Sequence, residues 1–254
     1  MNSTPYSAAA NVPPPLPPAG YSFPGAPAPG DEPGEREPIT NVLTAAESIL
    51  RQPRRVMYQL RQPGAGRLTL AMVLVVILCS LVYGLVVGTF SDGVQLWAAP
   101  VKIAGGLLVS ALLCLPSLYI FACLSGSQAR LSEIWGLVAG LLLLTAILLI
   151  GFAPVAWLFS QSTDSLAWMG AFHLLFWSIS TGFGLRFLAN GFSHSRARSS
   201  AGLNTWMVIF VLVAVQMTTA LRPILGTAST FLPEEKKFFL VHWGDCLNLK
   251  DLVR

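Results

Sequence analysis

The sequence predicts an all-α integral membrane protein: a five-transmembrane-helix bundle with a disordered, proline-rich N-terminal tail and amphipathic flanking helices. Of its 254 residues, 54% are hydrophobic and 11% are charged, whereas a soluble domain carries about 25% charged residues. The mean hydropathy is +0.62. Such a chain has too little polar surface to cover a water-soluble core, so lipid must be its solvent. Five long apolar runs, joined by short polar connections, set the number of spans.

Residues 1–38 contain eleven prolines, with Ala, Gly and Ser between them. This composition buries too little apolar surface to offset the entropy of ordering, so we expect a disordered cytoplasmic tail with polyproline II character. Its PxxP spacing suits an aromatic groove on a protein partner, and a solvated tail without a partner explains the same composition. The tail lacks the apolar run of a cleavable signal peptide. We therefore expect the first span to act as a retained signal anchor.

Residues 39–66 form a predicted amphipathic, basic interfacial segment. Apolar residues recur at helical spacing from Ile39 to Leu50, Thr40 or Asn41 suits the N-cap, and Pro53 breaks the helix. Five arginines lie within seventeen residues beside the first span, and such clusters attract anionic lipid headgroups. Orientation of the first span alone is the alternative explanation. The predicted headgroup contacts are Arg51, Arg54, Arg55, Arg61 and Arg67, together with Arg222 after the last span.

Residues 67–222 form the predicted transmembrane domain. Each span needs about 20 mostly apolar residues, and the first run contains no charged residue. Pro100, Pro116 and Pro154 interrupt later runs and are expected to kink or end helices. The spans are expected at 68–90, 97–124, 134–159, 168–188 and 205–221.

The distribution of positive charge predicts the orientation. Lysine and arginine near span ends mark the cytoplasmic side, and nine fall on one side of the five spans against four on the other. The predicted cytoplasmic set is Arg51, Arg54, Arg55, Arg61, Arg67, Arg130, Arg186, Arg196 and Arg198, and the opposite set is Lys102, Arg222, Lys236 and Lys237. We therefore expect a bacterial inner-membrane (plasma-membrane) protein with its N-terminus in the cytoplasm. Residues 223–254 form the extracytoplasmic tail, with a short interfacial helix at 233–243.

Two polar residues inside the spans are candidates for function. Lys102 lies about one turn inside the exterior end of the second run, where its stem can carry the ammonium to the headgroups or the charge can face a substrate or ion. His173 lies at a comparable depth in the fourth run. A histidine in a membrane helix can also simply hydrogen-bond a neighbour, so both functional and structural roles are open.

Small residues recur at four-residue spacing in several runs, which lets helix backbones approach closely in lipid. The predicted packing residues are Ser80, Gly84, Gly88, Gly136 and Gly140. Packing within one bundle explains them, and a homo-oligomer joined through the Ser80, Gly84 and Gly88 face is the alternative.

The sequence contains no set of residues typical of intramembrane catalysis. It has no GxSG with a partner histidine, no HExxH and no paired aspartates within a run. Its four cysteines form no CxxC pair or Cys/His cluster, so we expect no metal and no cofactor. The basic residues form no stripe interleaved with aromatic residues, so nucleic acid is not an expected partner.

The chain resembles the bacterial form of the Yip (Ypt-interacting protein) family. The features are the lead-in Ile49-Leu50-Arg51-Gln52-Pro53-Arg54-Arg55-Val56, five closely spaced runs, Lys102 in the second and a short Ser-Gly loop at 125–127. The resemblance covers about residues 47–221 and concerns topology. It implies five spans and a cytoplasmic N-terminus.

Two hypotheses for function follow. The first is a non-enzymatic scaffold or membrane-organising protein, whose partners are the lipid bilayer, anionic headgroups, and a protein bound by the N-terminal tail or a second copy. The alternative is a channel or transporter subunit for a small solute, with Lys102 and His173 facing a cavity.

Overall fold

The computed structural model describes residues 29–221, apart from 90–94, 128, 163–165 and 194–200. Every regular element in that part of the chain is a helix, which confirms the all-α prediction. The helices are η1 (Pro33–Arg36, a 3-10 helix), α1 (Val42–Arg51), α2 (Pro53–Leu60), α3 (Ala65–Thr89), α4 (Gln95–Leu124), α5 (Leu131–Ser162), α6 (Leu166–Ser193) and α7 (Ala201–Ala220).

Within the described residues, four helices are long and apolar enough to cross a membrane: α3, α4, α5 and α7. The fourth predicted span, 168–188, lies inside α6. This helix is 28 residues long, but His173, Arg186, Asn190 and several hydroxyl groups interrupt its apolar sequence. The structure therefore shows four membrane-compatible helices, and the fifth crossing stays a prediction.

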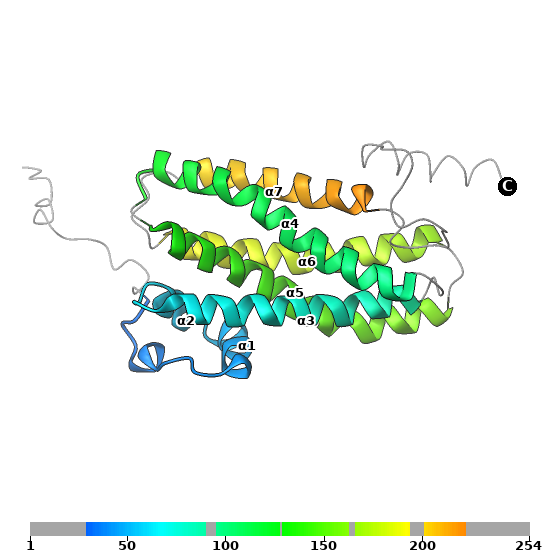
Figure 1. Cartoon of the computed structure of the whole chain (residues 1–254), viewed down its shortest axis with the longest axis horizontal. Helices are drawn as coiled ribbons and strands as arrows, with labels where there is room; N and C mark the ends of the chain where they lie inside the picture. The colour runs from blue at the N-terminus through cyan, green and yellow to red at the C-terminus, as the bar shows by residue number, and fades with distance from the viewer. Residues whose placement is uncertain (1–28, 90–94, 128, 163–165, 194–200, 222–254) are drawn as a thin grey trace, which may run out of the picture.

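The long helices pack in the order α6, α5, α3, α4 and α7. Helix α5 packs against both α3 and α6, while α4 packs between α3 and α7 (Figure 1). The most apolar stretch of α5 is 67% buried inside the protein, compared with 17% for that of α7. Helix α5 is thus the inner helix of the bundle, and α7 is an outer helix that depends on α4.

Helix α3 shows how the chain separates protein-facing from outward-facing residues. It buries Met72, Val76, Ser80, Tyr83 and Val87, which recur every three or four residues on one side of the helix. The opposite side exposes large aliphatic residues, namely Leu70, Leu74, Leu78, Val82 and Leu85. Exposing this apolar face to water would be unfavourable. In lipid the same face would contact acyl chains that are equally apolar.

Three of the predicted packing glycines lie where another element approaches closely. A Cβ atom on Gly84 would overlap the backbone of Pro100 in α4, one on Gly136 would overlap Leu60, and one on Gly140 would overlap Phe187. Ser80 and Gly88 are also buried in the single chain. The predicted Ser80, Gly84 and Gly88 face is therefore used inside the bundle and is not a free surface for a second copy.

The prolines expected to kink or end helices lie inside longer helices. Pro100 and Pro116 belong to α4, and Pro154 belongs to α5. Both helices continue past them: α5 extends to Ser162.

Residues 29–62, which contain η1, α1 and α2, form a cap at the end of the bundle where α3 and α5 begin (Figure 1). Ile49 of α1 and Val56, Met57 and Leu60 of α2 belong to the same hydrophobic cluster as Met72 of α3. The cap therefore shares the core of the bundle.

The predicted boundaries in this region need one correction. The break at Pro53 is confirmed, because α1 ends at Arg51 and Pro53 begins α2, and Asn41 is the N-cap of α1. Residues 29–38, however, belong to the predicted disordered tail by composition, and in the structure they contain η1 and bond to α2. The other predicted flanks, 1–28 and 222–254 with the helix at 233–243 and Arg222, lie outside the described residues.

Candidate functional site

Glu35 anchors the beginning of the cap. Its carboxylate is 8% exposed, lies 2.9 Å from Arg54 Nε in an ion pair, and accepts a hydrogen bond from the Gly30 backbone N–H at 2.5 Å. Gly30 has a φ of 98°, and a Cβ there would overlap the ring of Tyr58. This position therefore requires glycine for both its conformation and its space. One acidic residue of the predicted tail thus ties the chain to α2.

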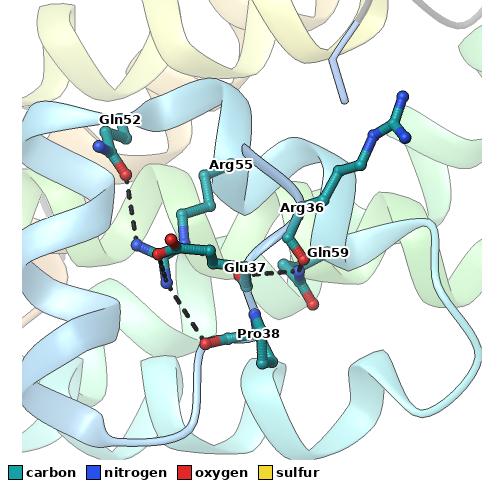
Figure 2. A network of polar contacts seen from close by, with 6 residues as sticks. All are labelled: Arg36, Glu37, Pro38, Gln52, Arg55 and Gln59. Carbon is teal, nitrogen blue, oxygen red and sulfur yellow. Dashed lines mark hydrogen bonds and ion pairs between the residues drawn. The ribbon is translucent and has the colours of Figure 1, made fainter. Parts of the chain in front are cut away.

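Arg55 holds the next part of the segment. Its Nε donates to the Glu37 carbonyl oxygen at 3.0 Å, and its guanidinium lies 3.6 Å from the Glu37 carboxylate. The two remaining nitrogens donate to the Pro38 carbonyl and to the Gln52 side chain, both at 3.3 Å (Figure 2). The planar guanidinium supplies donors in several directions, so a single arginine satisfies backbone groups that an extended segment would otherwise leave to water.

Gln59, one turn further along α2, extends this network. Its amide nitrogen donates to the carbonyl oxygens of Arg36 and Glu37 at 3.3 and 3.1 Å (Figure 2). Residues 36–38 therefore lie along α2 through side-chain bonds to their backbone.

Arg61 connects the cap to the bundle. Its Nε donates to Glu133 Oε1 at 2.9 Å, and the two side chains are 29% and 17% exposed. Glu133 lies in the first turn of α5, where a carboxylate also interacts favourably with the helix dipole. This pair joins residues 72 positions apart in sequence.

Neutralising Glu133 should loosen the cap. For Glu133→Gln we expect α2 to be destabilised by about 1 kcal/mol relative to the bundle, less than for a fully buried pair because water screens both partners. Amide hydrogen exchange over residues 53–62 should accelerate. The control is Glu47→Gln, whose partner Arg51 lies 3.3 Å away with both side chains mostly exposed. Equal exchange in the two variants would contradict the role of the Arg61 pair.

The arginines predicted to contact headgroups separate into two groups. Arg54, Arg55 and Arg61 pair with carboxylates of the protein itself. Arg51, which pairs with Glu47 one turn earlier on α1, and Arg67 are exposed at the cap end. Sequence reasoning missed these partners; the acidic residues of 31–37 were the available signal for Arg54 and Arg55, whereas the partner of Arg61, Glu133, lies in another helix.

His173 contacts a residue that the sequence did not single out. The Tyr83 hydroxyl and His173 Nδ1 share a hydrogen bond of 2.7 Å, with the two rings edge to face and their centroids 5.8 Å apart. Tyr83 is 3% exposed. The predicted intramembrane histidine therefore joins α6 to α3. In the sequence, Tyr83 could be recognised only by its position one turn after the predicted packing residue Ser80.

Lys102 is 2% exposed and lies on α4 beside the close approach of Pro100 to Gly84. Its side chain is buried in the structure, and both predicted roles, reaching the headgroups or facing a substrate or ion, stay predictions. His173 is hydrogen-bonded to Tyr83 of α3, and a cavity shared by Lys102 and His173 stays a prediction.

The fold and these contacts define the class of the protein: an all-helical chain with four membrane-compatible helices and a folded cap tied to one end of the bundle. No family model, curated protein or solved structure matches the chain. The resemblance to the Yip family stays a prediction from topology. The described residues contain no cluster of three or more His, Cys, Asp or Glu side chains that could hold a metal ion.

Proposed function

We propose that this protein is a non-enzymatic, multi-pass membrane protein of scaffold or membrane-organising type. In this proposal α6 is the fifth span, the cap lies on the cytoplasmic side of a bacterial inner membrane, and the cap rests on the anionic leaflet. The excess of arginine at the cap end supports the orientation. The observation that carries the proposal is the outward face of α1.

Helix α1 has two apolar faces. Ala45 and Ile49 are buried against the bundle, with 1% and 2% exposure. Val42, Leu43 and Leu50 point away from it, and Leu43 is 83% exposed. Leu43 and Leu50 are seven residues apart, so they share one side of the helix. A helix that is apolar on both sides has a second apolar neighbour, because water would not favour the outward leucines.

The lipid bilayer is the neighbour that fits this face. Helix α1 packs against α3, whose outward side carries Leu70 and Leu74, so the apolar surface of the cap lies next to the lipid-facing surface of the span. The exposed Arg51 ends α1, and Arg67 follows the cap. Apolar residues at the acyl boundary with arginines at the headgroups are typical of an interfacial helix on anionic lipid.

Depth-dependent quenching tests this arrangement. In a cysteine-free, full-length background, Leu43→Cys and Glu47→Cys would each be labelled with bimane and reconstituted in vesicles that contain an anionic phospholipid. We expect lipids brominated in the acyl chains to quench the label at 43 several-fold more than the label at 47, because Leu43 lies among the outward apolar side chains whereas Glu47 lies at their edge, paired with Arg51.

The two positions lie one turn apart on the same helix, so each serves as the other's control for folding and labelling. Aqueous iodide should show the reverse order. Strong iodide quenching at both positions, with no effect of the brominated lipid, would contradict the proposal.

A further inference from the structure

The core of the bundle is divided into two hydrophobic clusters. The main cluster extends from the cap to Val76 of α3 and Ala146 of α5. The second begins at Tyr83 of α3 and Leu149 of α5. Trp177 of α6 packs against both. The interruption therefore lies at one level of α3, α5 and α6.

Buried polar side chains lie at this level and, at His173, within the stretch of α6 that belongs to the second cluster. The hydroxyl groups of Ser80, Ser180 and Thr181 and Nε2 of His173 are buried, and none has a hydrogen-bond partner in the part of the chain that the structure describes. The three hydroxyl residues are at most 3% exposed. Nearly all buried polar atoms in proteins are paired with protein or water, so each of these groups calls for a partner.

The hydroxyl groups differ from others in the same bundle. Thr69, Ser110 and Thr145 each donate to the carbonyl oxygen four residues earlier, at 3.1, 2.7 and 2.9 Å. This bond is the usual way for a helical serine or threonine to satisfy its hydroxyl in a membrane. Ser80, Ser180 and Thr181 do not make it. They therefore need a partner of another kind.

Counted along their helices, these groups run from the second cluster toward the cap. Tyr83 and His173 are hydrogen-bonded. Ser180 lies seven residues after His173, on the same side of α6 and about 10 Å along the helix. Ser80 lies about 4.5 Å before Tyr83 on α3. Both steps lead toward the cap, since α3 begins and α6 ends there. The Thr145 hydroxyl lies 3.5 Å from the Ser180 carbonyl, which places α5 beside Ser180.

We propose that ordered water occupies this interruption and bridges His173 Nε2 to the hydroxyl groups of Ser80, Ser180 and Thr181. If the Tyr83 hydroxyl donates to Nδ1, the neutral imidazole carries its proton on Nε2 and donates to the first water. An uncharged ligand suits the three helices that carry these groups, because residues 68–89, 134–162 and 168–185 contain no Asp, Glu, Lys or Arg, whereas the buried Lys102 lies on α4. The site is independent of the lipid contact proposed for the cap, so either can fail alone.

Replacing Thr181 by valine tests the proposal through the sign of its effect. Valine has the shape of threonine without the hydroxyl. If water bonds to that hydroxyl, Thr181→Val should lower the apparent Tm of the full-length protein in nanodiscs by about 2–4 °C. If the site is dry, removing an unpaired hydroxyl should raise the Tm, and that result would overturn the proposal. Thr69→Val calibrates the substitution at a buried hydroxyl already paired within its helix.

A measurement on the unaltered protein does not depend on how a variant folds. With histidine and tryptophan labelled with 15N, we expect magnetisation to transfer from water to the His173 Nε2 proton, at a signal identified by its loss in His173→Gln. The buried Trp206 Nε1–H, bonded to the Cys114 carbonyl at 2.8 Å, should receive none. A visible His173 signal without transfer from water would overturn the water site.

Discussion

Replacing Gly84 by valine should force α3 away from α4 and destabilise the protein by about 2–3 kcal/mol. The glycine faces the backbone of Pro100 and the carbonyl of Ala99, and backbone atoms cannot move aside as a flexible side chain can. The change should also disturb the neighbouring Tyr83, because it lies next to Gly84 on the same helix. Thermal unfolding in nanodiscs measures the loss, as does the fraction folded in a titration with a denaturing detergent.

The chain offers a matched control at Gly182 in α6. A Cβ on this glycine would meet no atom within 4 Å, so Gly182→Val should change stability little. If both valine variants lost the same stability, the effect at Gly84 would reflect a general cost of valine in these helices and not the approach of α3 to α4.

Replacing Trp206 by alanine should release α7 from the bundle, at a cost of about 3–5 kcal/mol. Trp206 is 0% exposed, stacks on Phe210 with ring centroids 5.2 Å apart, and donates from Nε1 to the Cys114 carbonyl in α4 at 2.8 Å. Most of the outer helix α7 faces away from the protein. Its attachment to α4 therefore depends heavily on this side chain. Proteolysis of the full-length protein in nanodiscs, followed by unfolding, should show α7 loosened first.

Trp206→Phe separates the ring from its hydrogen bond. Phenylalanine keeps an aromatic ring against Phe210 but cannot donate to the Cys114 carbonyl, so the expected loss is about 1 kcal/mol for the bond plus a smaller term for lost volume. Equal losses for Trp206→Phe and Trp206→Ala would assign the whole effect to the hydrogen bond and contradict the packing argument.

The helices were predictable because the requirement that produces them is local. A backbone in lipid must satisfy its own hydrogen bonds, so an apolar run of sufficient length becomes a helix whatever its neighbours are. This explains why 68–90 and 97–124 correspond so closely to α3 and α4. Helix α6 is the instructive case. Its hydroxyl groups and His173 lower its hydropathy. Several of these groups are buried against other helices, and the sequence around them does not reveal that burial.

The cap shows where composition misleads. Prolines and charges made residues 29–38 resemble the rest of the tail, yet Glu35 and Glu37 meet Arg54 and Arg55 on α2. Opposite charges eighteen or nineteen residues apart come together because α1 lies between them and η1 packs against α2. The basic segment was correctly recognised as amphipathic, but its arginines have partners within the chain that spacing alone could not assign.

The sequence by itself determined the helical class of this protein, its long apolar helices, the break at Pro53 and the presence of polar residues among apolar ones. Each depends on composition or on neighbours within a few turns. Only the tertiary structure decided which partners those residues have: Tyr83 with His173, 90 positions apart, and Trp206 with the Cys114 carbonyl, 92 apart. The physical reason is that a polar group inside an apolar bundle must find its partner on another helix, and which helix lies beside it depends on how all of them pack.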